Sequence, residues 1–189
     1  NRISHHPPVS PDAARYRPWG AVALLLLFVQ IALGGWVSSN YATLACRDFP
    51  LCQGSWWPSM DVAAGFEIWR PLGKTADGAG LPFPALTAIH YAHRLMAYGV
   101  LAVLGVLAWR VRRVAGLERV GRWLLLMLLA QLITGLTNIF LDWPMAAAVL
   151  HTGGATALVG GLLMLNFRAG MGSRTATWRA IPAPALPVL

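Results

Sequence analysis

Charged residues are scarce in this chain. Asp, Glu, Lys and Arg make up 12% of its 189 residues, whereas hydrophobic residues make up 57%. A soluble domain of this length carries about 25% charged residues, so the composition argues against an ordinary soluble protein. We therefore interpret the chain as an integral membrane protein.

Carboxylates are absent from the long hydrophobic runs. Four runs approach or exceed the roughly 20 apolar residues that a helix needs to cross a bilayer, and they cover residues 19–37, 85–109, 123–141 and 145–167. The ionisable side chains inside them are His90, His93, Arg94 and His151. The sequence predicts an all-α integral membrane fold, a bundle of four transmembrane helices in the lipid bilayer.

Positive charge is concentrated in three regions. The formal net charge is +8, which in a soluble protein would suggest nucleic-acid binding. In a four-span topology the three regions fall on one side, which the positive-inside rule makes cytoplasmic. We therefore expect no nucleic-acid partner and both ends of the chain in the cytoplasm. The arginines that carry this pattern are Arg15, Arg17, Arg110, Arg112, Arg113, Arg119, Arg122, Arg168, Arg174 and Arg179.

This topology divides the chain into three parts. Residues 1–17 are expected to be a cytoplasmic linker, and residues 18–168 a transmembrane domain whose loop at 38–84 is extracytoplasmic. Residues 169–189 are expected to be a cytoplasmic tail rich in proline. The chain starts at Asn1 and has neither an initiator Met nor a signal-peptide pattern, so we expect it to be a piece of a longer protein.

Cysteine is limited to Cys46 and Cys52, in the segment CRDFPLC of the outer loop. An extracytoplasmic compartment is oxidising, and five intervening residues that include a proline let the chain turn back, which favours a disulfide. The alternatives are a redox-active pair, which usually has tighter C-x-x-C spacing, and a zinc site, which would need further Cys or His ligands nearby.

Two short patterns recur along the chain. The segments VQIALGG and AQLITGL both contain a Gln followed four residues later by a Gly, and the second and fourth runs each carry His near their outer ends. A duplicated hairpin would explain both patterns, although Gly is also frequent in membrane helices generally. The fourth run is rich in Gly, which indicates close helix packing or clearance for a flat cofactor.

The depth of the histidines suggests a shared ligand. His93 lies eight residues into its run, about 12 Å at a rise of ~1.5 Å per residue, and His90 is one turn shallower. His151 enters from the same side and lies roughly 9 Å deep by the same rise, level with the zone between the other two. Haem fits such a pair, because its iron accepts an imidazole on each face and its ring is apolar.

The other roles in this zone stay open. Spacing puts His90 and His93 on one broad face, so one imidazole would bind iron while the other points toward propionates, water or a substrate. Arg94 is a candidate propionate contact. The alternatives are interhelical hydrogen bonds alone, a zinc or copper site for which no Cys or carboxylate lies at that depth, and a proton relay without supporting carboxylates.

The residues also resemble a known family. The segment GGWVSSNYATLACRDFPLCQGSWWPSMDVAAGF, residues 34–66, closely resembles the first outer loop in the C-terminal half of bacterial haem A synthases. IHYAHR and VLHTGGA fall where that family has its haem-bearing helices. The resemblance covers roughly residues 18–168, and the loop motif is long and specific.

The resemblance implies an oxidoreductase of the bacterial cytoplasmic (inner) membrane that converts haem O to haem A for cytochrome oxidase assembly, by oxidising a ring methyl to a formyl group. It implies half of a pseudosymmetric eight-helix fold, with haem b between His93 and His151 and a disulfide between Cys46 and Cys52. The implied partners are haem O, the N-terminal half of the enzyme or a second copy, and haem O synthase.

His90 departs from the family's other half. That half carries a Glu three residues before a His-Arg pair, and the carboxylate is implicated in the substrate chemistry. Because His90 occupies this position here, we expect the chain to be the haem-holding half, with the catalytic residues unknown. The rival hypotheses are a membrane cytochrome b subunit that relays electrons, and a structural or assembly protein without a cofactor.

Overall fold

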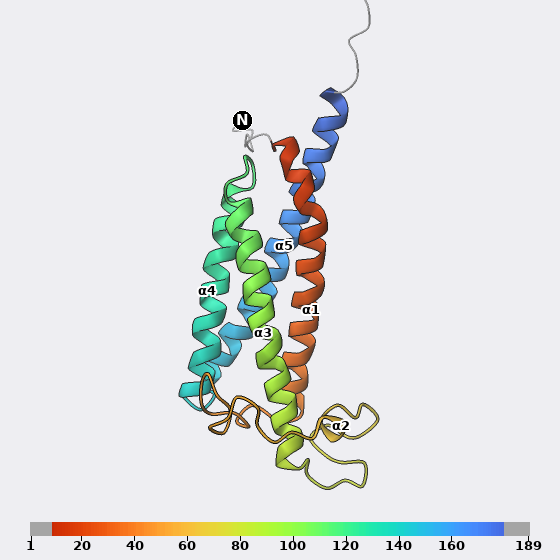
Figure 1. The fold of residues 1–189 in the computed structure, drawn as a ribbon, viewed down its shortest axis with the longest axis vertical. Coiled ribbons are helices and arrows are strands. Elements are labelled where there is room, and N and C mark those ends of the chain that lie inside the picture. The colour runs from red at the N-terminus through yellow and green to blue at the C-terminus, as the bar shows by residue number, and fades with distance from the viewer. Residues whose placement is uncertain (1–8, 180–189) are drawn as a thin grey trace, which may run out of the picture.

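The computed structural model describes the backbone of residues 9–179 and the side chains of residues 9–172. In this part of the chain all the regular elements are helices (Figure 1). Four of them are long and apolar enough to cross a membrane, which confirms the predicted four-span, all-α fold. The elements are η1 (Pro11–Tyr16), α1 (Arg17–Ser39), α2 (Val62–Gly65), α3 (Phe83–Val111), α4 (Glu118–Phe140) and α5 (Met145–Arg179).

Helical structure extends beyond the predicted runs at both ends of the chain. Residues 11–16, expected to be part of a linker, form η1 and pack against α5. The Ser10 hydroxyl oxygen accepts a hydrogen bond from the Asp12 N–H at 3.2 Å, and Ala13 is fully buried. Helix α5 continues to Arg179, through the first part of the expected tail. The rest of that tail, residues 180–189, lies outside the described residues.

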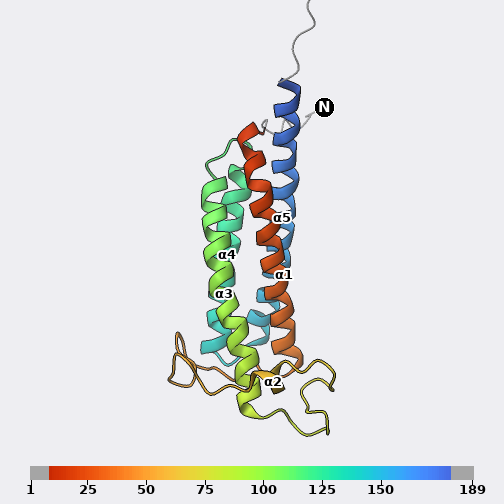
Figure 2. The ribbon, with the colours of Figure 1, turned by 45° about the vertical axis from the view of Figure 1, so that its right-hand side comes forward.

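The four long helices form a ring. Helix α1 packs against α3 and α5, and α4 packs against the same two helices. Helices α3 and α5 therefore face each other diagonally, as the two views in Figures 1 and 2 show. The ring consists of two hairpins, α1–α3 and α4–α5. When α1 is exchanged with α4 and α3 with α5, every helix keeps the same neighbours.

The two hairpins also repeat the same buried positions. In α1 and α4 the buried triplets Gly20, Ala23, Leu27 and Gly121, Leu124, Leu128 have identical spacing. Helices α3 and α5 also share one spacing of buried residues. These are Val100, Leu104, Leu107 and Val111 on α3, and Leu158, Leu162, Leu165 and Ala169 on α5. The duplication indicated by the Gln and Gly pattern is therefore visible in the packing, as an approximate two-fold axis along the bundle.

The largest buried hydrophobic cluster lies in one half of the bundle, and a smaller cluster at the outer end includes Val37, Ala85 and Ile89. The largest cluster ends at Leu27 on α1, Val100 on α3, Leu128 on α4 and Leu158 on α5. All of these lie toward η1 and the α3–α4 link, which we call the inner half. The outer half lies next to the loop of residues 40–82 (Figure 1). The predicted histidines belong to it, because they precede Val100 and Leu158 along α3 and α5.

Close packing explains some of the glycines of α5. A Cβ at Gly154 would lie 2.1 Å from Nε2 of Gln131, and one at Gly161 would lie 2.4 Å from the Trp123 ring, so α4 approaches α5 closely at both points. A Cβ at Gly153 would have no neighbour within 4 Å. Helix packing is thus the reason for two of these glycines.

Candidate functional site

His93 and His151 lie on the interior stripes of their helices. His93 is seven residues before Val100, and His151 is seven residues before Leu158, so each imidazole shares a helix face with the leucine core. The two histidines occupy equivalent positions under the approximate two-fold axis. The two residues predicted as a pair therefore lie at equivalent positions on the diagonal helices α3 and α5, in the outer half of the bundle.

Helix α1 contacts His93 through two residues of the repeated pattern. The Gln30 amide nitrogen lies 3.1 Å from Nδ1 of His93 and 3.2 Å from its backbone oxygen. A Cβ at Gly34 would lie 3.1 Å from Cε1 of the imidazole, so the absence of a side chain makes room for the ring. Gln30 and Gly34 together hold the imidazole against α1.

Helix α4 makes the equivalent contact with His151. A Cβ at Gly135 would lie 3.3 Å from Cε1 of His151. The hydroxyl oxygen of Thr134 lies 2.9 Å from Nδ1 of the same ring. Gly34 and Gly135 therefore serve the same purpose in the two hairpins, while the polar partner of the imidazole differs.

The outer half of the interior has the features of a site for a planar group with two axial imidazoles. The buried leucine core ends at Val100 and Leu158, about two turns below each histidine, and Gly34 and Gly135 lie beside the imidazoles. Oε1 of Gln30 is buried beside His93 without a hydrogen-bond partner. No cluster of three or more His, Cys, Asp or Glu able to hold a metal ion occurs among the described residues. A pair of imidazoles suits a haem iron better than a zinc ion, which takes four ligands.

A second face of α3 holds the outer loop. Four of its residues, at positions 87, 90, 91 and 94, follow the spacing of one helical stripe. Thr87 accepts a hydrogen bond from the Gln53 amide at 2.8 Å, and the Tyr91 hydroxyl donates to the backbone oxygen of Trp56. We call Thr87, His90, Tyr91 and Arg94 the loop-anchoring stripe.

His90 belongs to this stripe, and it is buried. Its Nδ1 lies 3.0 Å from the backbone oxygen of Ala42, which can only accept, so Nδ1 carries the proton. His90 thereby ties the chain just after α1 to α3. It stays a prediction that one of His90 and His93 binds iron while the other does not. The contacts favour His93 as the imidazole directed into the bundle.

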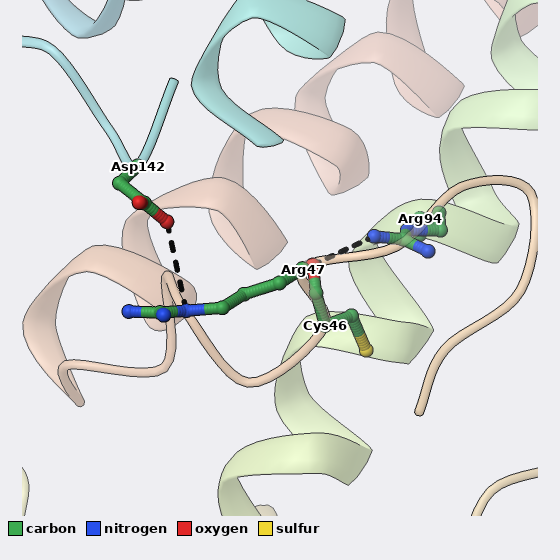
Figure 3. Close-up of polar contacts among 4 residues, drawn as sticks. All are labelled: Cys46, Arg47, Arg94 and Asp142. Atoms are coloured by element: carbon green, nitrogen blue, oxygen red, sulfur yellow. Dashed lines mark hydrogen bonds and ion pairs between the residues drawn. The ribbon is translucent and has the colours of Figure 1, made fainter. Parts of the chain in front are cut away.

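Arg94 is 5% exposed and contacts three loop carbonyls. Its guanidinium donates to the backbone oxygens of Asp48 at 2.8 Å, Leu51 at 2.6 Å and Cys46 at 3.0 Å, the last of which is drawn in Figure 3. These bonds occupy both terminal nitrogens and make Arg94 a loop anchor. The role predicted for it beside a propionate stays a prediction.

The outer loop contains the predicted disulfide. Cys46 and Cys52 are bonded, and both are buried against Tyr91. The neighbouring Arg47 reaches Asp142 of the α4–α5 turn at 3.6 Å (Figure 3). Both side chains are well exposed, so this ion pair contributes little stability. The loop is thus fixed mainly to α3.

Replacing Cys46 with Ser should loosen the loop without altering the histidine site. The loop keeps its bonds to Thr87, Tyr91 and Arg94 in this variant, so α3 and His93 should stay in place. We expect faster proteolysis between Ala42 and Trp57 and an unchanged haem absorption spectrum. A large spectral change would instead link the disulfide to the cofactor site.

Acid is expected to destabilise the turn that follows Cys46, because the Asp48 carboxylate stabilises this turn. This carboxylate accepts the N–H of Gln53 at 2.7 Å and of Gly54 at 2.8 Å. Desolvation raises the pKa of Asp48, but these hydrogen bonds outweigh it, so the pKa lies below its ordinary value. The stabilisation is therefore present above the ordinary pKa of aspartic acid and is lost as the pH falls through the lowered pKa.

Hydrogen exchange at the Gln53 and Gly54 amides tests this expectation. Protection of both amides should fall on acidification of the wild type, and Asp48→Asn should give protection that does not vary with pH over the same range. An equal acid response in Asp48→Asn would show that another group is responsible.

Comparison with known proteins decides the family. The family model described as cytochrome oxidase assembly protein (COX15-CtaA) matches residues 1–163. The chain belongs to this family. The resemblance predicted from the loop motif is thereby confirmed, and no solved structure matches the chain.

Curated relatives of the chain carry the name haem A synthase. The chain is 35% identical to the haem A synthase of Shewanella oneidensis over 150 residues, which cover 79% of the chain and 46% of that relative. It is 31% identical to those of a Caulobacter species and of Beijerinckia indica, over 78% and 80% of the chain and 41% of each relative. The chain thus spans less than half the length of these relatives.

Sequence reasoning missed part of the site in this family member. Thr134 gave no signal, because a Thr in a membrane helix usually bonds only to its own backbone. The loop-anchoring role of Thr87 and Tyr91 was also missed, since it depends on the path of the loop. The Gln and Gly pattern did contain Gln30, Gly34 and Gly135, and its repetition was the available signal.

Proposed function

We propose that this chain is the haem-binding half of a haem A synthase, with His93 and His151 as the axial ligands of one b-type haem. The observation that carries the proposal is the placement of both histidines at equivalent positions on diagonal helices, above the end of the leucine core. The names of the relatives support the synthesis of haem A, and the resemblance implies that haem A is made by oxidation of haem O.

The chain's own residues would orient the haem and exclude water. Gly34 and Gly135 let the imidazoles lie close to α1 and α4. The Gln30 amide nitrogen lies 3.1 Å from Nδ1 and 3.4 Å from Nε2 of His93, and the Thr134 hydroxyl lies 2.9 Å from Nδ1 of His151. The leucines below limit how deep the ring can sit. A bound haem would supply one-electron transfer between its ferric and ferrous forms.

Conversion of haem O by the intact gene product tests the proposed activity. Membranes that contain haem O but no other haem A synthase should accumulate haem A when the intact protein is expressed. Pigment extraction and chromatography measure both haems. Absence of haem A, from protein that is expressed and contains haem, would contradict the synthase assignment.

A second candidate is a cytochrome b subunit that relays electrons. The observation that favours it is the lack of any Asp or Glu in the interior of the four described spans, where Glu118 lies only in the first turn of α4. A relay would bind haem through the same two histidines and produce no haem A. The pigment experiment therefore separates the two candidates.

We further propose that the chain lies in the bacterial cytoplasmic membrane with both ends in the cytoplasm. The arginines before α1, between α3 and α4, and near residue 168 all lie at the inner end of the bundle, and the positive-inside rule supports this orientation. The proposed partners are haem O, haem O synthase, and either a second four-helix half or a second copy. The proposed boundaries remain 1–17, 18–168 and 169–189.

A further inference from the structure

Thr134 has more hydrogen-bonding neighbours than its single hydroxyl proton can serve. The hydroxyl oxygen lies 2.8 Å from the backbone oxygen of Ala130, 3.3 Å from that of Gln131 and 2.9 Å from Nδ1 of His151. The two backbone oxygens can only accept. The imidazole nitrogen can either donate or accept, depending on its tautomer.

One arrangement satisfies both the hydroxyl and the imidazole. If Thr134 donates its proton to the Ala130 oxygen, its lone pairs remain free to accept a proton from Nδ1 of His151. If it donated to Nδ1 instead, it would have no proton left for either backbone oxygen. The first arrangement forms two hydrogen bonds where the second forms one, and a Thr bonded to the carbonyl four residues before it is common in helices.

We propose that Thr134 is a positioning residue that holds the Nδ1 proton of His151 and so presents the unprotonated Nε2 to the haem iron. This inference rests on the proposed haem site. An imidazole ligand usually donates its second ring N–H to an acceptor, which fixes the tautomer and the ring orientation and makes the ligand more basic. In this chain a neutral hydroxyl provides that acceptor.

Gly135 completes the positioning of the ring. A Cβ there would lie 3.3 Å from Cε1 of His151 and 3.8 Å from Nδ1, so the imidazole rests against the α4 backbone on the side where Thr134 binds it. The ring therefore meets α4 along its edge from Nδ1 to Cε1.

The two proposed iron ligands are held by different groups. The position on α1 equivalent to Thr134 is Leu33, which has no polar side-chain atom. His93 instead contacts the Gln30 amide, whose nitrogen donates to the backbone oxygen of His93. The hydroxyl acceptor is thus specific to His151, and removing it should perturb one axial ligand only.

Replacement of Thr134 with Val tests the inference, because Val keeps the shape and loses the acceptor. In the intact gene product, loss of the Nδ1 bond should make His151 a weaker donor of electron density. Ferric haem should then be less stabilised than ferrous haem, so the reduction potential of the haem should rise. The rise is about 59 mV for each tenfold fall in the ratio of the protein's affinity for ferric haem to its affinity for ferrous haem. Haem affinity should fall by about 10- to 100-fold.

Matched variants separate positioning from simple packing. Thr134→Ser keeps the hydroxyl and should restore both the potential and the affinity. Thr137→Val is the control, because the half-buried Thr137 makes the same bond to its own helix, with the Ile133 oxygen at 2.8 Å. It should leave the potential unchanged.

Two results would overturn the inference. An unchanged potential in Thr134→Val, with haem still lost in His151→Ala, would remove the role of Thr134 and leave the haem site intact. An equal shift in Thr137→Val would assign the effect to the helix backbone. Haem that survives in His151→Ala would contradict the proposed site itself, so the two failures are distinguishable.

Discussion

Alanine in place of His93 or His151 is expected to remove haem from this chain. Each histidine is proposed to supply one of the two axial ligands, and loss of even a residue that supports a metal ligand costs about 10- to 100-fold in affinity. Loss of the ligand itself should cost at least as much. We expect a fall of at least about tenfold in the haem bound by this half, measured by the pyridine haemochrome method on the purified intact protein.

His90→Ala distinguishes the two imidazoles of α3. His90 bonds through Nδ1 to the Ala42 oxygen and lies on the loop-anchoring stripe, so its removal should weaken the loop and leave the haem absorption bands in place. Loss of haem in His90→Ala together with normal haem in His93→Ala would exchange the roles assigned to these two residues.

Loss of Arg94 is expected to produce the largest change in the outer loop. Its guanidinium donates three hydrogen bonds to backbone oxygens while 5% exposed. A hydrogen bond to a charged group contributes about 1.5–3 kcal/mol, and removing the donor leaves buried acceptors unpaired. Arg94→Ala should therefore destabilise the loop by an amount on the order of 3–5 kcal/mol.

Limited proteolysis and tryptophan fluorescence measure this effect, because Trp56 and Trp57 lie in the anchored segment. Arg94→Lys should recover only part of the loss, since an ammonium group lacks the planar fork that reaches separate carbonyls. Weaker haem retention with a fully protected loop would instead favour the predicted propionate contact for Arg94.

The spans could be predicted because their signals are local, whereas the pairing of His93 with His151 stays a prediction. Apolar runs of sufficient length identify membrane helices, and counting residues from the outer end of each run placed His93 and His151 at similar depth. The repeated Gln and Gly also reflected real packing, because Gly34 and Gly135 each make room for one imidazole.

The contacts of the outer loop could not be predicted in the same way. They join residues far apart in the sequence, such as Arg94 with Cys46 or Gln53 with Thr87, and no periodicity encodes the path of the loop between them. The η1 helix was missed because its prolines suggested a linker, whereas its stability comes from burial of Ala13 against α5.

The division of α3 into two faces is the main result of combining sequence and structure. Its interior stripe continues from the leucines to His93, while the loop-anchoring stripe carries His90 and Arg94. Neighbouring polar residues in one short segment therefore serve separate purposes. The same helix fixes the position of the loop and that of the proposed iron ligand.

Chemical rescue of the missing ligand tests the central claim most directly. The intact His151→Gly variant, reconstituted with haem, should lose the low-spin ferric signal of a bis-imidazole haem in electron paramagnetic resonance, and added imidazole should restore it. His93→Gly should behave in the same way. A low-spin bis-imidazole signal that persists in both variants without imidazole would contradict ligation by this pair.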